Sequence, residues 1–201
     1  MIREIDPRGP AFEYLRMDKG RMKKIIAIVK KSKFDDAFEK VTAFPLLISD
    51  HIGKQNYKDL IEIVRDEFGR SYIARRYSPV SLFRVINYFV WASVIYLKGV
   101  KNLRDILYEL SVAKATLVWT KKTLFGKDYL KYLTEEDEDG KGNYLDIVPV
   151  VKILSEYMDL PLKGKSLEEY KKAIIETCKE MIKEEERKQA EKQQKEGKND
   201  H

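Results

Sequence analysis

Residues 78–97 read SPVSLFRVINYFVWASVIYL, and this segment decides the fold because it is the most apolar part of the chain. Ser78 can accept a hydrogen bond from a free amide of a first helical turn, and a proline at the first helical position loses no needed donor. Gly99 provides a stop close behind Lys98. Because apolar side chains cover almost every direction of this helix, the pattern predicts a central helix that is buried on most sides.

A membrane span is the alternative interpretation, since about 20 apolar residues are long enough to cross a bilayer. Arg84 lies inside the window, and a central arginine costs at least about 2.5 kcal/mol on insertion scales. Basic residues flank both ends, so the charge asymmetry that orients a single span is missing. We therefore expect a buried helix and no contact with a membrane.

One face of the same helix combines an arginine with large apolar side chains. Arg84, Tyr88, Trp91 and Ile95 recur at helical spacing. One interpretation is an arginine stem that packs on aromatic rings at the rim of the core. The other is a cation and aromatic pair that contacts a nucleobase or a phosphate.

The composition is typical of a globular intracellular protein. Of the 201 residues, 43% are hydrophobic and 36% are charged, which is too apolar for a disordered chain and too charged for a membrane protein. The single cysteine excludes an intramolecular disulfide and a cysteine-based zinc site. The first residues lack the apolar run of a secretory signal, so we expect a cytoplasmic location. Abundant lysine and glutamate favour a thermophilic source.

Positive charge is concentrated in two blocks, although the net charge is only +6. Residues 68–127 contain 11 basic and 2 acidic side chains, and residues 16–33 contain 8 and 1. Residues 128–182 contain 8 basic and 13 acidic side chains. This uneven distribution favours contact with a polyanion, and it also permits head-to-tail self-association without nucleic acid.

Helical periodicity continues along most of the chain. The sequence predicts further helices over residues 21–31, 34–48, 56–68, 102–118 (on to Lys122 if the helix continues), 146–158 and 166–182. These patterns predict an all-α compact bundle of about six to eight helices. We expect residues 1–182 to form one helical domain and residues 183–201, which lack apolar periodicity, to form a frayed and disordered charged tail.

Arginine and tyrosine alternate in RSYIARRYS, residues 70–78, between two expected helices. Guanidinium groups bind phosphates and phenol rings stack on bases, so this mixture favours a nucleic acid. A loop whose arginines cap helices or pair with acids of residues 134–139 is the alternative. The same mixture recurs in residues 101–122. The predicted nucleic-acid-binding residues are Arg70, Tyr72, Arg75, Arg76, Tyr77, Arg84, Lys101, Arg104, Tyr108, Lys114, Lys121, Lys122, Lys23 and Lys24.

The sequence lacks the common motifs of catalysis and metal binding. It contains no P-loop, no glycine-rich dinucleotide turn, no GxSxG elbow and no zinc motif. His51 has no second histidine nearby, and the acidic segment 134–143 lacks the glutamate that completes a calcium loop. We expect a protein that is not an enzyme and has no cofactor and no metal site.

A basic, motif-free helical chain of this size resembles the small subunits of archaeal CRISPR surveillance complexes, especially those of the type I-A Cascade. The resemblance spans mainly residues 54–182, and it is carried by residues 70–77, the apolar helix after Pro79 and a basic helix over residues 101–122. It implies an antiviral-defence subunit without chemistry of its own, which binds RNA and DNA.

In that resemblance, copies of the subunit stack along a guide RNA, steady the displaced single strand of DNA and contact the guide and target duplex. The implied partners are therefore nucleic acid, other subunits of a multi-protein complex and further copies of the chain. The alternative is a helical scaffold of an archaeal or viral assembly, whose basic faces meet acidic partner surfaces.

Overall fold

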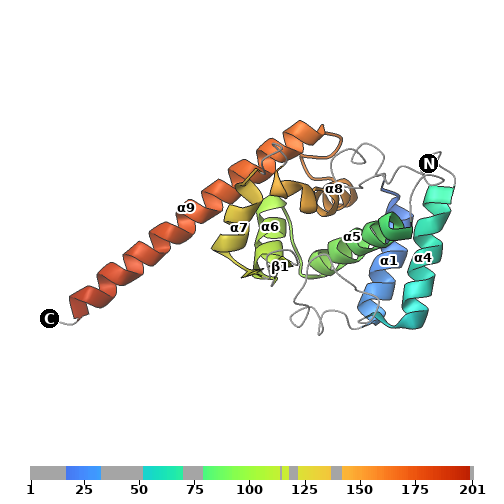
Figure 1. Ribbon diagram of the computed structural model, residues 1–201, viewed down its shortest axis with the longest axis horizontal. Helices are drawn as coiled ribbons and strands as arrows, with labels where there is room; N and C mark the ends of the chain where they lie inside the picture. The colour runs from blue at the N-terminus through green and yellow to red at the C-terminus, as the bar shows by residue number, and fades with distance from the viewer. Residues whose placement is uncertain are drawn as a thin grey trace.

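The computed structural model describes residues 17–32, 52–69, 79–113, 115–117, 122–136 and 142–199, without the side chains of 65–69, 79–84, 115–117, 122 and 197–199. In that part of the chain, seven α-helices form a compact bundle (Figure 1), and the predicted all-α fold is confirmed. They are α1 (Lys19–Lys31), α4 (Lys54–Gly69), α5 (Pro79–Leu97), α6 (Leu103–Val112), α7 (Lys127–Thr134), α8 (Val148–Tyr157) and α9 (Leu167–Asn199).

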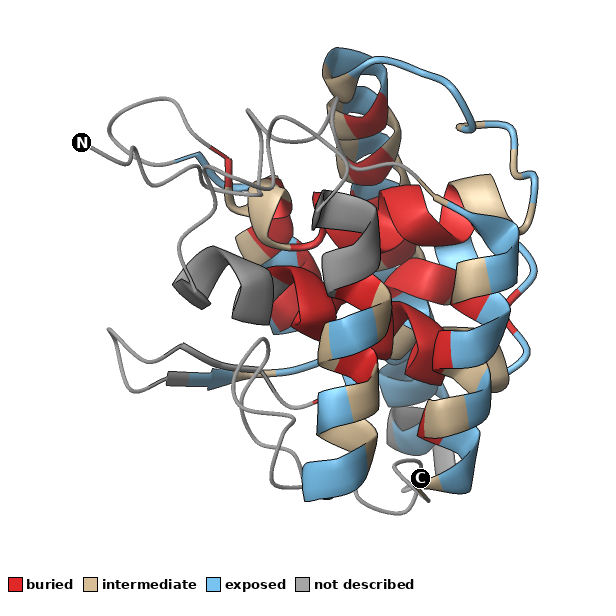
Figure 2. Cartoon of the chain, turned by 90° about the vertical axis from the view of Figure 1, so that its right-hand side faces the viewer, coloured by how far each residue is buried: buried red, intermediate tan, exposed pale blue. Residues whose placement is uncertain are grey.

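Helix α5 is the centre of the bundle, as its sequence predicts. It packs against α1, α4, α6 and α8, and every residue from 85 to 95 is buried. Figure 2 shows this buried core between helices whose outer sides are exposed. The helix is closed by Gly99, whose amide donates to the carbonyl oxygen of Tyr96 and whose φ is 81°. No helix among the described residues has the length and hydropathy that a membrane span needs.

The aromatic face of α5 belongs to the core. Tyr88 and Trp91 are each 1% exposed, and Ile95 is fully buried. The interpretation that these rings contact a nucleobase is therefore wrong, because packing against neighbouring helices leaves no ring face accessible to a base. The backbone of Arg84 lies in α5, whereas its side chain is outside the described part of the chain.

Helix α6 is shorter than the sequence predicts. The side chain of Asn102 accepts from the amide of Asp105, as expected of its N-cap, but the helix ends at Val112. An antiparallel hairpin of β1 (Ala115–Leu117) and β2 (Lys122–Leu124) follows. The β-branched side chains in this segment suit a strand better than a helix. The predicted basic helix over residues 101–122 is therefore wrong.

Helix α9 begins at a capping box formed by Ser166 and Glu169. The Glu169 amide donates to Ser166 Oγ at 3.3 Å, and the Ser166 amide donates to Glu169 Oε2 at 2.8 Å. The first half of α9 buries its apolar side chains against α6 and α7. A 3-10 helix, η3 (Asn143–Asp146), follows α7 in the chain.

The second half of α9 is a charged helix that extends away from the bundle (Figure 1). The sequence predicts a disordered tail from residue 183, whereas the structure has helix as far as residue 199. Its residues have high helix propensity, and ion pairs four residues apart add to it. These pairs are Arg187–Glu191, Lys188–Glu184 and Lys192–Glu196.

The starts of α8 and α4 lie within two residues of the starts that the sequence predicts. Pro149 lies in the first turn of α8, where a missing amide leaves no intrahelical hydrogen bond unmade. The helix predicted from residue 56 begins earlier, at Lys54, and the Asn56 side chain donates to the carbonyl oxygen of Ile52. The helix predicted over residues 34–48 lies outside the described residues.

Candidate nucleic-acid interface

The predicted binding residues fall into three groups. The structure does not describe Arg70, Tyr72, Arg75, Arg76, Tyr77, Lys114 and Lys121. It gives only the backbone of Arg84 and Lys122, in α5 and β2. Five predicted residues have described side chains, and they lie on two separate helices or next to them: Lys23, Lys24, Lys101, Arg104 and Tyr108.

Helix α1 presents lysines on the side opposite its core contacts. Asp18 caps the helix by accepting from the amide of Arg21 at 2.6 Å. Because the apolar side chains at i, i+3 and i+7 pack against α5, the polar side is fixed in orientation. Its exposed cations define the lysine face of α1: Lys23, Lys24, Lys30 and Lys31.

The lysine face is not neutralised by the described part of the protein. No carboxylate among the described residues forms an ion pair with any of its four lysines. Residues seven positions apart lie on one line of a helix, so Lys30 follows Lys23 and Lys31 follows Lys24, roughly 10 Å along the axis. The face therefore offers two short parallel rows of ammonium groups to a polyanion.

Lys19 also lies on the exposed side of α1, but it has an acidic partner. Its Nζ pairs with a carboxylate oxygen of Asp159, which also pairs with Lys163. Hydrogen bonds from Lys163 and then from Lys19 lower the pKa of Asp159 to about 2. The carboxylate is thus ionised at neutral pH, and it ties the start of α1 to the turn after α8.

The predicted residues on α6 and just before it do not form a continuous basic face. Arg104 pairs with Glu184 of α9. The Lys101 side chain is exposed and Tyr108 is 55% exposed. The predicted face needed one helix as far as Lys122, and the chain turns into a hairpin before that residue.

Helix α9 supplies acids to cations of α6 and α7. Glu186 lies 3.8 Å from Lys127 Nζ and 3.5 Å from Lys131 Nζ, in addition to the pair between Glu184 and Arg104. Residues 183–201 balance to zero net charge, so their average composition gives no sign of this role. Part of the positive block of residues 68–127 is therefore offset within the molecule.

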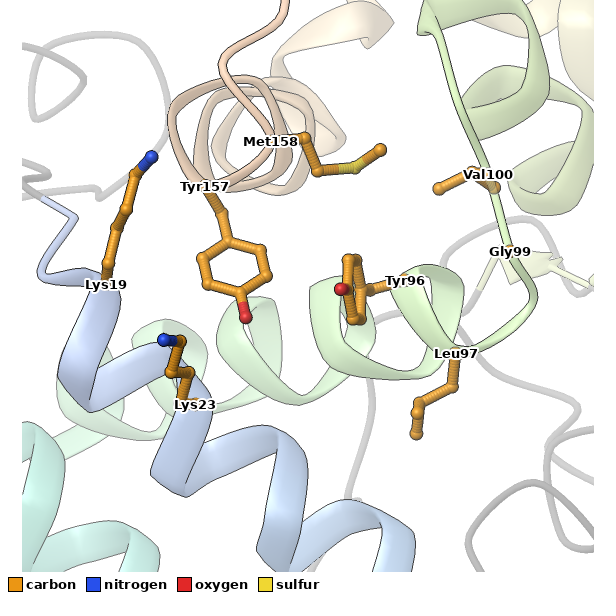
Figure 3. Close-up of a pocket in the computed structure, with 8 residues that line it drawn as sticks. All are labelled: Lys19, Lys23, Tyr96, Leu97, Gly99, Val100, Tyr157 and Met158. Atoms are coloured by element: carbon orange, nitrogen blue, oxygen red, sulfur yellow. The ribbon is translucent and has the colours of Figure 1, made fainter.

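A groove between α1, α5 and α8 is the feature that sequence reasoning missed (Figure 3). It is open to solvent and has a volume of about 740 Å³. Its lining comes from the exposed side of α1, from the end of α5 with the turn after it, and from the end of α8: Lys19, Lys23, Tyr96, Leu97, Gly99, Val100, Tyr157 and Met158.

Two tyrosines meet inside this groove. The ring centroids of Tyr96 and Tyr157 are 5.1 Å apart, and the ring planes cross at 78°, an edge-to-face arrangement. Burial, followed by the proximity of Tyr96 and a hydrogen bond with it, raises the pKa of Tyr157. Figure 3 shows the Tyr157 ring between the two lysines of α1 and the ring of Tyr96. The groove thus places two phenol rings beside ammonium groups.

Comparison with known proteins finds no matching family model, no matching curated protein and no matching solved structure. Within the described ranges, no cluster of three His, Cys, Asp or Glu side chains is placed to hold a metal ion. The chemistry of the lysine face and of the adjoining groove therefore has to carry the functional interpretation.

Proposed function

We propose that the protein is a non-catalytic nucleic-acid-binding subunit and that it holds a single strand on the lysine face of α1. The observation that carries this proposal is the set of four exposed lysines that the described residues leave unpaired on one rigid helix. Ammonium groups that neutralise phosphates release counterions, which drives binding without sequence preference. The sequence contains no zinc-finger motif that would read bases, which supports low specificity.

The sequence resemblance extends this proposal to a place in a larger assembly. A small subunit of an archaeal type I-A Cascade would hold the displaced DNA strand or the guide and target duplex, together with other subunits and with copies of itself. The lysine face supports such a role because its ammonium groups can bind the phosphates of DNA and of RNA alike. The predicted contacts of Arg75 and Arg76 belong to the same proposal and lie outside the described residues.

The first experiment measures binding of labelled single-stranded DNA and RNA by fluorescence anisotropy at several salt concentrations. The variant Lys24→Gln/Lys30→Gln/Lys31→Gln removes three charges from the lysine face. Single strands give a slope of log K against log salt of about −0.7 per phosphate contact, so we expect the slope to become shallower by about two.

The matched control is Lys172→Gln/Lys179→Gln/Lys183→Gln, which removes three exposed charges from α9. It has the same net charge as the test variant, and we expect it to bind like the wild type. Equal losses in the two variants would show that only net charge matters. Absence of binding by the folded wild type at low salt would overturn autonomous binding by this chain.

An exposed apolar patch favours a second candidate, a protein–protein interaction. Tyr108 and Val112 lie one turn apart on α6 and are 55% and 45% exposed, and Phe125 is 60% exposed. The Gly126 amide donates to the carbonyl oxygen of Ser111, which brings Phe125 close to the end of α6. Exposed apolar side chains on α6 and near its end are typical of an interaction surface. Loss of self-association on Phe125→Ser, measured by sedimentation velocity, would support this candidate.

A further inference from the structure

The groove between α1, α5 and α8 continues the lysine face. Lys23 belongs to both, because it lies on the exposed side of α1 and also lines the groove. A strand that follows the lysines of α1 toward the start of the helix therefore reaches the mouth of the groove. The apolar lining begins there, with aliphatic side chains and the pair of tyrosines described above.

The charges at the groove fit an anion. Lys19 and Lys23 contribute two ammonium groups to its lining, and the described residues that line it include no carboxylate. Asp159 lies next to Met158 and offsets Lys19 through their ion pair. Lys23 is then the cation that remains for a ligand, at one end of a mostly apolar cavity.

The shape and chemistry together fit an aromatic anion. A volume of about 740 Å³ lies in the range of pockets that hold small ligands, roughly 300–1,000 Å³. The half-buried rings of Tyr96 and Tyr157 offer stacking and edge contacts, and every nucleobase has a face that can stack on such a ring. An uncharged aliphatic ligand would use the apolar lining but would leave the ammonium group of Lys23 without an anion.

We infer that this groove takes one nucleotide unit of the bound strand, with its base against Tyr157 and Tyr96 and its phosphate on Lys23. The inference rests on the proposed nucleic-acid binding and adds a site for a base to a surface that otherwise contacts only phosphates. It commits the groove to an unstacked base, and hence to single-stranded nucleic acid, since a paired base cannot enter.

The test compares two labelled single strands of equal length and charge, one with thymine at every position and one abasic throughout. Stacking of one base on an aromatic side chain corresponds to at least about fivefold in affinity. We expect the wild type to bind the thymine strand at least fivefold more tightly. Tyr157→Leu should remove this preference, and Tyr132→Leu, at a half-buried tyrosine of α7 outside the groove, should keep it.

The outcomes separate the two proposals. Equal binding of both strands by the wild type, or a thymine preference that survives in Tyr157→Leu, overturns the groove inference and leaves binding to the lysine face intact. Absence of binding to either strand overturns the proposed function and the inference with it. Circular dichroism checks that each variant is folded.

A crosslinking measurement on the wild type keeps the inference testable if Tyr157→Leu does not fold. A strand that contains 5-iodouracil is irradiated in complex with the protein, and the crosslinked peptide is mapped by mass spectrometry. Crosslinks at Tyr157 or Tyr96 are the expected result. Crosslinks that fall only outside the groove lining contradict the inference.

Discussion

Asp159 combines an unusual backbone conformation with a structural role. Its φ is 56°, in the left-handed region that aspartate enters more easily than most residues. This geometry ends α8, where the Leu160 amide donates to the carbonyl oxygen of Ser155 at 2.9 Å. The reversal of the chain brings the carboxylate to Lys19 and Lys163, so one residue closes a helix and fixes a wall of the groove.

The lowered pKa of Asp159 predicts a pH dependence of stability. Its ordinary pKa of 3.8 applies to the unfolded chain, and its pKa in the folded protein is about 2. The contribution of the carboxylate is fully present above pH 4 and is lost as the pH falls through 2. We expect the urea midpoint of the wild type to fall more steeply between pH 5 and pH 2 than that of Asp159→Asn.

The asparagine variant is the suitable comparison because asparagine also tolerates the left-handed region and changes only the charge. Other carboxylates, such as Glu169, titrate equally in both proteins and cancel in the difference. Parallel curves for the wild type and the variant over this pH range would contradict the assigned role of Asp159.

Single residues that cap helices were predictable, whereas the groove residues were not. Asn102 and the pair of Ser166 and Glu169 act within three positions of themselves, so the local sequence contains their signal. Tyr96 and Tyr157 are 61 positions apart, and only the packing of α5 against α8 brings their rings together. The spacing of apolar residues predicts the helices that contain Tyr96 and Tyr157, but it does not predict which residues of the two helices meet.

Helix α1 owes the position of its lysines to its apolar side. Ile25 is fully buried where α1 packs on α5. We expect Ile25→Ala to lower the free energy of unfolding by about 2–5 kcal/mol, since a large aliphatic side chain is lost from a packed core. Lys24→Ala, on the exposed side of the same helix, should stay within about 0.5 kcal/mol of the wild type.

Urea denaturation of the two α1 variants measures this contrast. Lys24→Ala should bind single strands more weakly without a loss of stability. Ile25→Ala should have a lower free energy of unfolding. A stable Ile25→Ala protein would show that α1 does not depend on its packing against α5.

The apolar side chains on all sides of α5 predict its place in the core correctly, whereas the end of α6 could not be predicted from the spacing of apolar residues. The spacing of Ile106, Leu107 and Leu110 predicted their burial correctly. The apolar side chain at residue 117 continues the same spacing, although residues 115–117 form the strand β1. Periodicity alone cannot distinguish these cases, because three-residue strands are too short to show an alternation of their own.

For the whole molecule, the outer part of α9 should contribute little to stability. Residues 188–196 are exposed, and the pairs Arg187–Glu191, Lys188–Glu184 and Lys192–Glu196 lie between neighbours on the same helix. Such exposed pairs contribute about 0.3–0.5 kcal/mol each. Deletion of residues 188–201 should therefore reduce the helical circular dichroism signal and change the free energy of unfolding by less than about 1 kcal/mol.

Deletion of residues 183–201 is the companion variant, because it also removes Glu184 and Glu186. These acids pair with Arg104 of α6 and with Lys127 and Lys131 of α7. We expect the longer deletion to leave Arg104, Lys127 and Lys131 without these acidic partners and to increase the binding of single strands at low salt. A deletion of residues 188–201 that unfolds the protein would contradict the division of α9 into an inner and an outer part.

The length of α9 also governs how the protein moves through solution. Its 33 residues correspond to roughly 50 Å, about three times the radius of gyration of about 17 Å that a compact chain of 201 residues would have. A rod attached to a small body increases hydrodynamic friction more than it increases mass. A monomer of 23.6 kDa should therefore diffuse slowly and leave a gel-filtration column early, so elution volume will overstate the number of chains in the particle.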